Sequence, residues 1–470
     1  MLQNMWQELV DAVDDRSAKG IALALSAGID RGVLRPGERL PPIRRVARDL
    51  QVAPATISAA WSQLTRAGLI ETDGRRGTRV REASVGPRRY RRALDAQAAY
   101  RVDVSTGLPD PRLLPDLHAA MQRVPRDDTP HSYLEEPVVP ALREVLEESW
   151  PNAVEALTVV DGAMDAHSQF VAAHLRFGDR VAVEQPCFPP LLDLLEMAGA
   201  VPLGVGYDAE GPVVADVVAA LDAGAKVLFF QPWGQNPSGQ SLSKTRADEL
   251  ALVLAGRDVV VVEDDSAGGT PSGPPISLGA FLPDRTVLVR SFSKTHGPDL
   301  RLAAVGGPAA VVRPIVERRY LGQGWSSRLV QSILLELLTD PVSCALVAEA
   351  QATYAARTGA MADALAARGI GVPGRDGINV WVPVAEREAA LLHLAAAGVR
   401  AASGEPFWIS SPPGHHIRIT TSSIDPSDAG SGSASDPASD RAPGPEHPGV
   451  CDLADLVAEA ARAGTWAGHR

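Results

Sequence analysis

Short apolar runs alternate with helical patterns between about residue 101 and residue 421. The runs are LTVV, RVAVEQ, KVLFFQ, DVVVVEDD, RTVLVR and LAAVGG, and the helical patterns include VVPALREVLEES and TRADELALVLAG. Short, continuous apolar runs are typical of strands that are buried on both faces. Their alternation with helices predicts an α/β fold with a mainly parallel sheet covered by helices on both faces.

Residues 1–81 follow another pattern, in the order helix, turn, helix, turn, helix, hairpin. Apolar residues recur at helical spacing on both sides of the turn QVAP, so two short helices can pack across it. The ending GLIETDGRRGTRV predicts two strands whose connecting turn carries Arg75 and Arg76. This order predicts a winged helix-turn-helix domain that binds DNA, with a small helical interaction module as the alternative.

Two further segments separate by composition. Residues 82–100, EASVGPRRYRRALDAQAAY, form a basic linker between the first domain and the body at 101–470. Residues 422–449 are rich in Ser, Asp, Pro, Gly and Ala, which predicts a disordered insertion. The helical pattern CDLADLVAEAARAG resumes afterwards, so the insertion interrupts the body without ending it.

Charge is distributed unevenly along the chain, whose net charge is −12. Residues 1–92 hold 17 basic and 10 acidic residues, whereas the remainder holds 28 basic and 47 acidic residues. A basic head on an acidic body is expected when only the head meets a polyanion. The distribution therefore favours double-stranded DNA as the partner of the head.

The sequence argues against a membrane protein, a secreted protein and a protein stabilised by disulfides or zinc. No apolar run approaches the roughly 20 residues that span a bilayer, and the start MLQNMWQELVDAVDD lacks the pattern of a signal peptide. The three cysteines are widely separated, which predicts neither a disulfide framework nor a zinc cluster. We therefore expect a cytoplasmic protein without a membrane partner or a metal.

Lysine is rare in this chain: of 45 basic residues only those at 19, 226, 244 and 294 are lysines. Lys294 lies in RSFSKTHGPDLR, and a lysine that forms a Schiff base with an aldehyde cofactor needs several companions. The sequence offers donors for a phosphate, a carboxylate for a ring nitrogen, an aromatic ring and an amide: Gly162, Ala163, Ser291, Ser293 and Arg301; Asp264; Phe188; and Asn236. Taken singly, Asp264 can be a strand-end cap, Phe188 a core residue and NPSG a plain turn.

Residues 16–81 resemble the GntR-type winged helix-turn-helix, on RPGERLP at 35–41 and on the GLI...GRRGTRV ending. The resemblance implies a recognition helix that begins at about residues 54–56. It also implies DNA contacts by Arg44, Arg45, Thr56, Arg75 and Arg76. Ala53, Pro54 and Ser58 stand where relatives often carry base-reading side chains, so we expect phosphate contacts to dominate.

Residues 101–421 and the last helix resemble the fold-type I pyridoxal-phosphate proteins of the aspartate aminotransferase class. The marks are HSYLEE, GAM, EQPCF, NPSG, VVEDD, SFSK followed seven residues later by Arg301, and RIT. The resemblance implies a smaller C-terminal α+β subdomain and pyridoxal 5'-phosphate as the cofactor.

The same resemblance implies a role for each site residue. Lys294 would hold the cofactor as the internal aldimine, Asp264 would pair with the pyridinium nitrogen, and Asn236 would bind the phenolic oxygen. Phe188 would stack on the ring, and Arg418 would bind a substrate carboxylate. The phosphate would be held by Gly162, Ala163, Ser291, Ser293 and Arg301, with Tyr133 reaching the phosphate of the neighbouring subunit.

Three positions depart from the pattern of the class. Ser266 replaces a tyrosine that holds the phenolic oxygen, and Asp161 replaces a serine at the phosphate turn. The glycine expected after HSYLEE is absent, and PVVP follows instead. An aspartate at this turn adds negative charge beside a dianion unless its side chain points elsewhere.

A GntR-type head joined to an aminotransferase-like body resembles the MocR regulators. This implies a homodimer that binds promoter DNA and senses pyridoxal phosphate or its aldimine with an amino compound. One alternative is a working aminotransferase, of the transaminase class, with an accessory DNA-binding head. Another is a DNA-binding scaffold whose body has lost the cofactor. Ser266 favours sensing with weak or no turnover.

Overall fold

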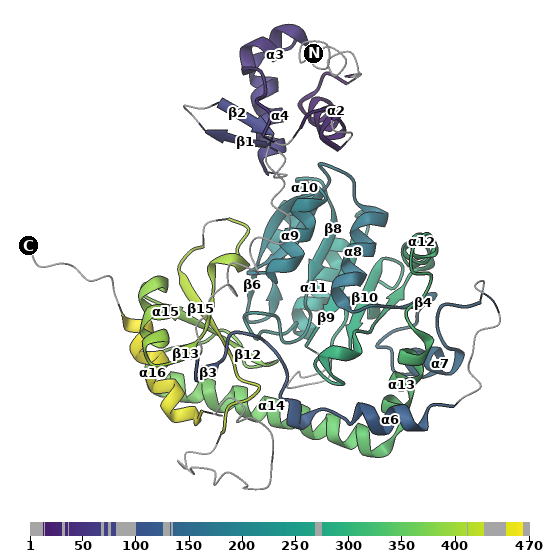
Figure 1. Cartoon of the computed structure of the whole chain (residues 1–470), viewed down its shortest axis with the longest axis vertical. Helices are drawn as coiled ribbons and strands as arrows, with labels where there is room; N and C mark the ends of the chain where they lie inside the picture. Colours follow the sequence, from purple (N-terminus) through teal and green to yellow (C-terminus); the bar gives the residue numbers. More distant parts are fainter. Residues whose placement is uncertain are drawn as a thin grey trace, which may run out of the picture.

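The computed structural model describes most of the chain, and Figure 1 shows a small N-terminal head above a larger body. The described residues are 13, 15–30, 33–35, 37–66, 70–73, 77–80, 100–125, 132, 135–267, 275–410, 412–426 and 448–463. The predicted linker lies outside them except for Tyr100, and residues 427–447 of the predicted insertion lie outside them as well.

The head is a three-helix unit with a two-stranded wing. Its elements are α2 (Ala18–Asp30), α3 (Ile43–Asp49), α4 (Pro54–Arg66), β1 (Ile70–Asp73) and β2 (Gly77–Val80). The apolar positions of the predicted helical spacing, Ile57 and Trp61 among them, lie in one buried cluster. The wing strands pair antiparallel, so the predicted winged helix-turn-helix is confirmed. Phe177 of the body packs against the head's cluster.

The body contains an eight-stranded sheet in the order β4-β11-β10-β9-β8-β5-β6-β7. Strands β10, β9, β8, β5 and β6 are parallel neighbours, and β11 runs antiparallel between β10 and β4. The predicted mainly parallel sheet is therefore confirmed. Its strands are β4 (Ala156–Val160), β5 (Arg180–Gln185), β6 (Val201–Asp208), β7 (Gly211–Pro212), β8 (Ala225–Phe230), β9 (Val260–Asp265), β10 (Thr286–Ser291) and β11 (Ala303–Gly307).

Helices cover both faces of this sheet because alternate strand residues point to opposite sides. Val287 and Val289 of β10 pack in a cluster with α8 (Ala163–His174), α9 (Pro189–Met197) and α12 (Ala309–Tyr320). Leu288 packs in another cluster with α7 (Pro140–Glu148) and α13 (Arg328–Thr339). The remaining helices of this part are α6 (Leu117–Arg123), α10 (Val214–Asp222) and α11 (Lys244–Leu254).

A smaller α+β subdomain completes the body, as predicted. The long helix α14 (Pro341–Ala367) connects it to the large part (Figure 1). It contains a three-stranded antiparallel sheet and a parallel strand pair, which pack on two helices. These elements are β12 (Asn379–Val384), β14 (Ala402–Ser403) and β15 (His415–Thr420); β3 (Val102–Asp103) and β13 (Val399–Arg400); and α15 (Arg387–Ala396) and α16 (Val450–Arg462).

Backbone hydrogen bonds join the two ends of the predicted insertion. Asp425 N donates to Pro448 O at 3.0 Å, and Val450 N donates to Asp425 O at 2.9 Å. The chain therefore leaves and re-enters the subdomain at one place, and α16 docks on β12 as a continuation of the same unit. No helix among the described residues is long and apolar enough to cross a membrane.

Candidate functional site

The predicted site residues gather at one edge of the large sheet because parallel strands end together. Strands β4, β5, β8, β9 and β10 lead at this edge into Asp161, Pro186, Gln231, Ser266 and Phe292. Adjacent registers place Phe230 opposite Glu263 and Asp264 opposite Val289, so Gln231, Asp264 and Ser291 come from neighbouring strands. Segment 104–110 and strand β15 of the smaller subdomain contribute further contacts at this edge.

Lys294 follows β10 and extends toward the segment before α6, where its Nζ donates to Gly107 O. Removal from water lowers the pKa of Lys294 to about 8, and the positive charges of Arg418 and Arg301 contribute to the shift. A lower pKa increases the fraction of neutral amine near pH 7, and the neutral amine is the form that attacks an aldehyde.

Arg418 on β15 lies beside the same segment. Its Nη2 donates to Ser105 O, and a Cβ placed on Gly107 would lie 3.4 Å from Nη2. Its Nη1 donates to Asn236 Oδ1 at 3.0 Å, which brings the predicted carboxylate clamp next to the predicted ligand of a phenolic oxygen. The guanidinium also lies 5.4 Å from the ring centre of Phe407. Arg418 is 2% exposed, so its orientation is fixed by packing.

Gln231 connects Asn236 to Asp264. Its Oε1 accepts from Asn236 N at 2.6 Å, and its Nε2 donates to Asp264 Oδ2 at 2.9 Å. Its backbone N donates to the buried carboxyl of Glu184 at 2.7 Å. Hydrogen bonds therefore join Arg418 to Asp264 through Asn236 and Gln231. Lys294 and Arg418 both donate to the segment 105–107, Lys294 to Gly107 O and Arg418 to Ser105 O.

Asp264 is 5% exposed, and its surroundings keep it ionised. Burial alone raises the pKa of Asp264, but the nearby His167 and hydrogen bonds from Ser266 and Gln231 outweigh burial and lower it. His167 Nε2 lies 3.4 Å from Asp264 Oδ2. A buried, ionised carboxylate suits a protonated ring nitrogen.

The turn predicted to bind the cofactor phosphate, here called the phosphate turn, consists of residues 161–163 and leads into α8. Gly162 adopts φ of 96°, and a Cβ at this position would lie 3.1 Å from Arg301 Nη2. Ala163 begins the 12-residue helix α8, whose first amides form an anion-binding end. Ser291 Oγ accepts from Ser293 N at 3.3 Å on the neighbouring segment. A side chain at 162 would displace Arg301, so glycine, helix end and guanidinium form a cradle that fits a phosphate.

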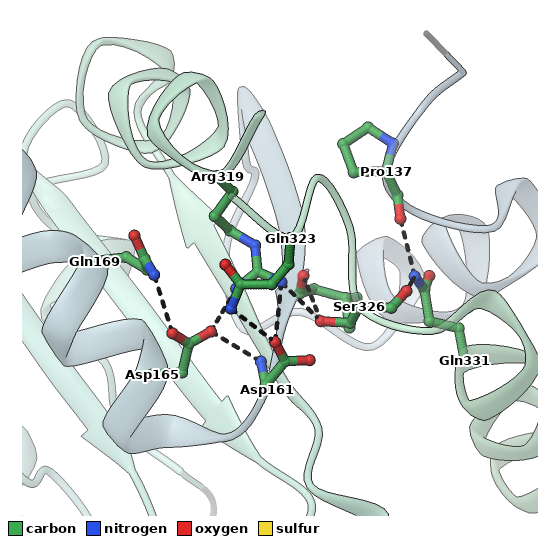
Figure 2. Close-up of polar contacts among 9 residues, drawn as sticks. Pro137, Asp161, Asp165, Gln169, Arg319, Gln323, Ser326 and Gln331 are labelled. Atoms are coloured by element: carbon green, nitrogen blue, oxygen red, sulfur yellow. Dashed lines mark hydrogen bonds and ion pairs between the residues drawn. The ribbon is translucent and has the colours of Figure 1, made fainter. Parts of the chain in front are cut away.

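The two substituted positions both have new partners. Ser266 Oγ donates to Asp264 Oδ1 at 2.5 Å, so it supports the carboxylate instead of reaching outward like a tyrosine. Asp161 Oδ2 accepts from Arg319 Nη2 and from Gln323 Nε2, each at 3.3 Å (Figure 2). The extra negative charge at the phosphate turn is therefore paired.

Phe188 and Tyr133 are two further residues that were predicted to bind the cofactor. Phe188 lies half-buried immediately before α9, at the end of the segment that follows β5. Tyr133 lies outside the described residues. Of the predicted cofactor and substrate set, the structure thus connects Arg418, Asn236 and Asp264 by hydrogen bonds, with Lys294 near Arg418. It also brings Gly162, Ala163 and Arg301 together at the turn before α8.

The predicted DNA-binding residues lie on the head. Arg44 and Arg45 are exposed on α3, and Arg45 Nε lies 3.7 Å from Asp49 Oδ2. Thr56 is half-buried in the first turn of α4, which begins at Pro54 as predicted for the recognition helix. Arg75 and Arg76, the predicted wing tip, lie outside the described residues.

The structure shows two further exposed arginines on the head that were not among the predicted DNA-binding residues. Arg39 and Arg79 are exposed and pair in an antiparallel backbone bridge beside the wing. Gly77 lies against Arg39, since a Cβ there would be 3.0 Å from Arg39 Nη2. The arginines within RPGERLP and GTRV were the available signal, but only the strand pairing places them together.

Sequence reasoning also missed three residues around the cofactor site. Gln231 could have been found, because it ends an apolar strand run in the way Asp264 does. His167 carried only the weaker signal of a polar residue one turn into α8. Arg319 carried none, because its contacts with Asp161 and Asp165 cross more than 150 residues of sequence.

Comparisons with known proteins agree with this two-part architecture. Residues 17–80 match the family model described as bacterial regulatory proteins, gntR family. Among solved structures, the α-aminoadipate aminotransferase LysN from Thermus thermophilus superposes with a TM-score of 0.67 at 20% identity, covering 85% of this chain and 98% of that one. A Thermus thermophilus aspartate aminotransferase superposes with a TM-score of 0.62 at 23% identity, covering 71% and 91%. These two likenesses show the fold of the body.

Similarity to one relative extends over head and body together, and another relative matches a shorter part of the chain. The chain is 36% identical over 424 residues to the vitamin B6 salvage pathway transcriptional repressor PtsJ of Salmonella typhimurium, covering 88% of this chain and 96% of PtsJ. It is 26% identical over 316 residues to the pyridoxine biosynthesis transcriptional regulator PdxR of Corynebacterium glutamicum, covering 63% and 67%. Because head, body and full-length relatives agree, the chain belongs to the MocR-type transcriptional regulators of the GntR family.

Proposed function

We propose that this regulator binds pyridoxal 5'-phosphate in its body and changes its affinity for promoter DNA in response. The observation that carries the proposal is the hydrogen-bonded series from Arg418 to Asp264 together with the proximity of Arg418 to Lys294, whose pKa it lowers. A candidate amine, carboxylate clamp and ring-nitrogen partner thus lie at one edge of the sheet. The similarity to PtsJ, a repressor of vitamin B6 salvage, and to PdxR, a regulator of pyridoxine biosynthesis, supports vitamin B6 metabolism as the regulated process. We further propose a cytoplasmic homodimer.

The side chains of this chain would each hold one part of the cofactor. When bound, pyridoxal phosphate supplies an aldehyde that reacts reversibly with amines. Lys294 would supply the amine, and Asp264 would keep a proton at the ring nitrogen. Gly162, Ala163 and Arg301 would bind the phosphate through amides and a guanidinium. A free amino compound with a carboxylate would compete with Lys294 and be held by Arg418.

Cofactor binding is tested by titrating the full-length protein with pyridoxal phosphate and recording visible absorbance. Lys294→Ala should lose the bound band, whereas Lys226→Ala should retain it. Lys226 is a suitable control because it is another lysine of the body, 63% exposed, and it pairs with Asp179 at 2.9 Å. A band of equal intensity in Lys294→Ala would overturn the assignment of the amine.

DNA response is tested with the same protein and the DNA upstream of its own gene. Fluorescence anisotropy should give dissociation constants that differ about fivefold or more with and without saturating pyridoxal phosphate, the usual scale of coupling between sites. Identical dissociation constants in a protein that binds the cofactor would contradict regulation by this ligand.

Catalytic transamination is the second candidate. The contact between Arg418 and Asn236 favours it, because a fixed guanidinium beside Lys294 is suited to an amino acid carboxylate. Ser266 argues against it, since its hydroxyl is committed to Asp264. Incubation with amino acids and an oxo acid separates the two functions: the sensor performs at most one turnover per site, and many turnovers would establish an enzyme.

A further inference from the structure

Arg319 is a buried arginine beneath the phosphate turn. Its side chain is 1% exposed, on α12, and lies between two carboxylates in Figure 2. Its Nη1 donates to Asp165 Oδ2, and its Nη2 lies 3.3 Å from Asp161 Oδ2. A charged group removed from water in this way needs paired and hydrogen-bonded partners.

The guanidinium is held in place by more than Asp161. Its Nη2 also donates to Ser326 Oγ at 3.0 Å, and Ser326 Oγ in turn donates to Val159 O at 3.3 Å. Gln331 Nε2 donates to Ser326 O and to Pro137 O, each at 2.8 Å. Arg319 therefore points a fixed positive charge at residue 161, whatever the conformation of the Asp161 side chain.

Asp161 is the residue whose position needs control. It directly precedes Gly162 in the turn that borders Arg301, and its backbone N donates to Asp165 Oδ2 at 3.0 Å. Its side chain is 41% exposed, so its carboxylate is not confined by burial. An unpaired carboxylate at this turn would repel a dianionic phosphate.

We propose that Arg319 is a positioning residue for cofactor recognition. Arg319 of α12 and the nearby Gln323 bind the Asp161 carboxylate and hold it in place. With this carboxylate paired, the turn at 161–163 can accept a phosphate. This inference rests on the proposed binding of pyridoxal phosphate at Gly162 and Ala163. It accounts for an aspartate at a turn where related sites place a serine. Arg319 also binds Asp165, but Asp165 keeps hydrogen bonds from Asp161 N and Gln169 Nε2 when Arg319 is lost. The loss of phosphate affinity should therefore come mainly from the Asp161 carboxylate, and removal of that carboxylate should offset it.

Binding of two ligands tests the pair in the full-length protein. Pyridoxal phosphate and pyridoxal differ only in the phosphate, and dissociation constants are measured by absorbance titration. Arg319→Gln should weaken pyridoxal phosphate about tenfold and pyridoxal less than about twofold. Asp161→Ser should stay within about threefold of the natural protein for both ligands, and the double variant should recover most of the lost affinity.

Arg246→Gln is the matched control. Arg246 is also an arginine with two acidic partners, Asp208 at 3.0 Å and Glu249 at 3.1 Å, but it lies on α11 near the other edge of the sheet. Its loss should lower the melting temperature without changing the ratio of the two dissociation constants. An Arg319→Gln protein that loses both ligands equally, or a double variant without recovery, would refute the positioning role.

Gln323→Ala provides a second test if Arg319→Gln does not fold. It removes one hydrogen bond to Asp161 from an exposed residue and leaves the buried ion pairs intact. Pyridoxal phosphate should bind about two- to threefold more weakly, and pyridoxal should be unaffected. An unchanged ratio here would count against the inference, whereas failure of the natural protein to bind pyridoxal phosphate would refute the proposed function itself.

Discussion

Two arginines lie close enough to Lys294 to change its chemistry. Arg418 and Arg301 add to the effect of burial, which lowers the pKa of Lys294 to about 8. In water, a lysine would hold its proton until about pH 10.4 and would be a poor nucleophile at pH 7. The residues that would bind the two anionic ends of a ligand thus also increase the reactivity of the amine between them.

We therefore expect covalent capture of pyridoxal phosphate to accelerate with pH. Below the pKa the neutral fraction rises about tenfold per pH unit, so the rate should climb up to about pH 8 and then level. Arg418→Gln removes a positive charge, raises the pKa of Lys294 and should move the midpoint to higher pH. Stopped-flow absorbance between pH 6 and 9 measures both, and an unmoved midpoint would exclude an effect of Arg418.

His296, two residues beyond Lys294, predicts a loss of stability in acid. Burial lowers the pKa of His296 to about 4 from an unfolded value of 6.5, so the unfolded chain binds a proton that the folded protein excludes. This contribution to stability is complete above pH 6.5 and is lost as pH falls toward 4. At about 1.4 kcal/mol per unit, the loss approaches ~3 kcal/mol.

Denaturant unfolding at pH 7.5 and pH 5 checks this expectation. His296→Phe should flatten the difference, because the ring packs edge-on against Phe292 and phenylalanine can keep that contact. His118→Gln, at an exposed histidine of α6, should leave the difference unchanged. An equally steep loss in His296→Phe would place the acid sensitivity elsewhere.

Helix α3 places the positive charges of three arginines on the exposed side of the head. Helix α3 is short and carries Arg44, Arg45 and Arg48 on exposed positions, while Val46 and Ala47 face the core. The arginines therefore lie on the solvent side of the helix that precedes the recognition helix. Arg39 and Arg79 extend the positive surface to the wing.

Arg44→Ala should weaken DNA binding uniformly across sequences and reduce its salt dependence. Each phosphate contact contributes about one unit to the slope of log affinity against log salt concentration, so the slope should fall by roughly one. Arg45→Ala should have a smaller effect because Arg45 shares its charge with Asp49. Anisotropy titrations at several salt concentrations measure the slope, and Arg257→Ala in the body is the control.

Head and body have separate hydrophobic cores. The buried cluster of the head contains residues from Val13 to Val80, and the body has its own clusters, with Phe177 packing against the head. Because head and body each have their own hydrophobic core, each part is expected to keep its local structure when a site residue of the other part is substituted. Any effect of a ligand in the body on the DNA affinity of the head must therefore be transmitted through the contacts and the linker that join the two parts.

Lys294→Ala is expected to leave basal DNA affinity within about twofold while abolishing the response to pyridoxal phosphate. The residues predicted to contact DNA phosphates lie on the head and do not include Lys294, whereas the response requires a ligand that binds two states differently. The dissociation constant for DNA is measured with and without the cofactor, beside Lys226→Ala. A folded Lys294→Ala protein without basal DNA binding would contradict the separation.

The amino-acid sequence predicted most strands of the large sheet and proposed the residues of the candidate site. Apolar runs predicted β4, β5, β8, β9, β10 and β11, because buried parallel strands need continuous apolar residues. Polar residues at the ends of such runs, Asp264 and Asn236 among them, were expected at one edge of the sheet because parallel strands end together. The structure connects these two residues through Gln231. Strand β6 escaped prediction, since its sequence VPLGVGYD contains two glycines and a proline that weaken the pattern.

Tertiary structure alone decided the partners. Arg319 meets Asp161 across 158 residues, and Arg418 meets Asn236 across 182, distances over which local pattern carries no information. Asp161 was expected to add negative charge beside a phosphate unless its side chain pointed elsewhere, and in the structure its carboxylate accepts from Arg319 of α12 and from Gln323. Sequence specifies which charges a segment carries; the order of strands and the docking of helices determine which charges neutralise one another.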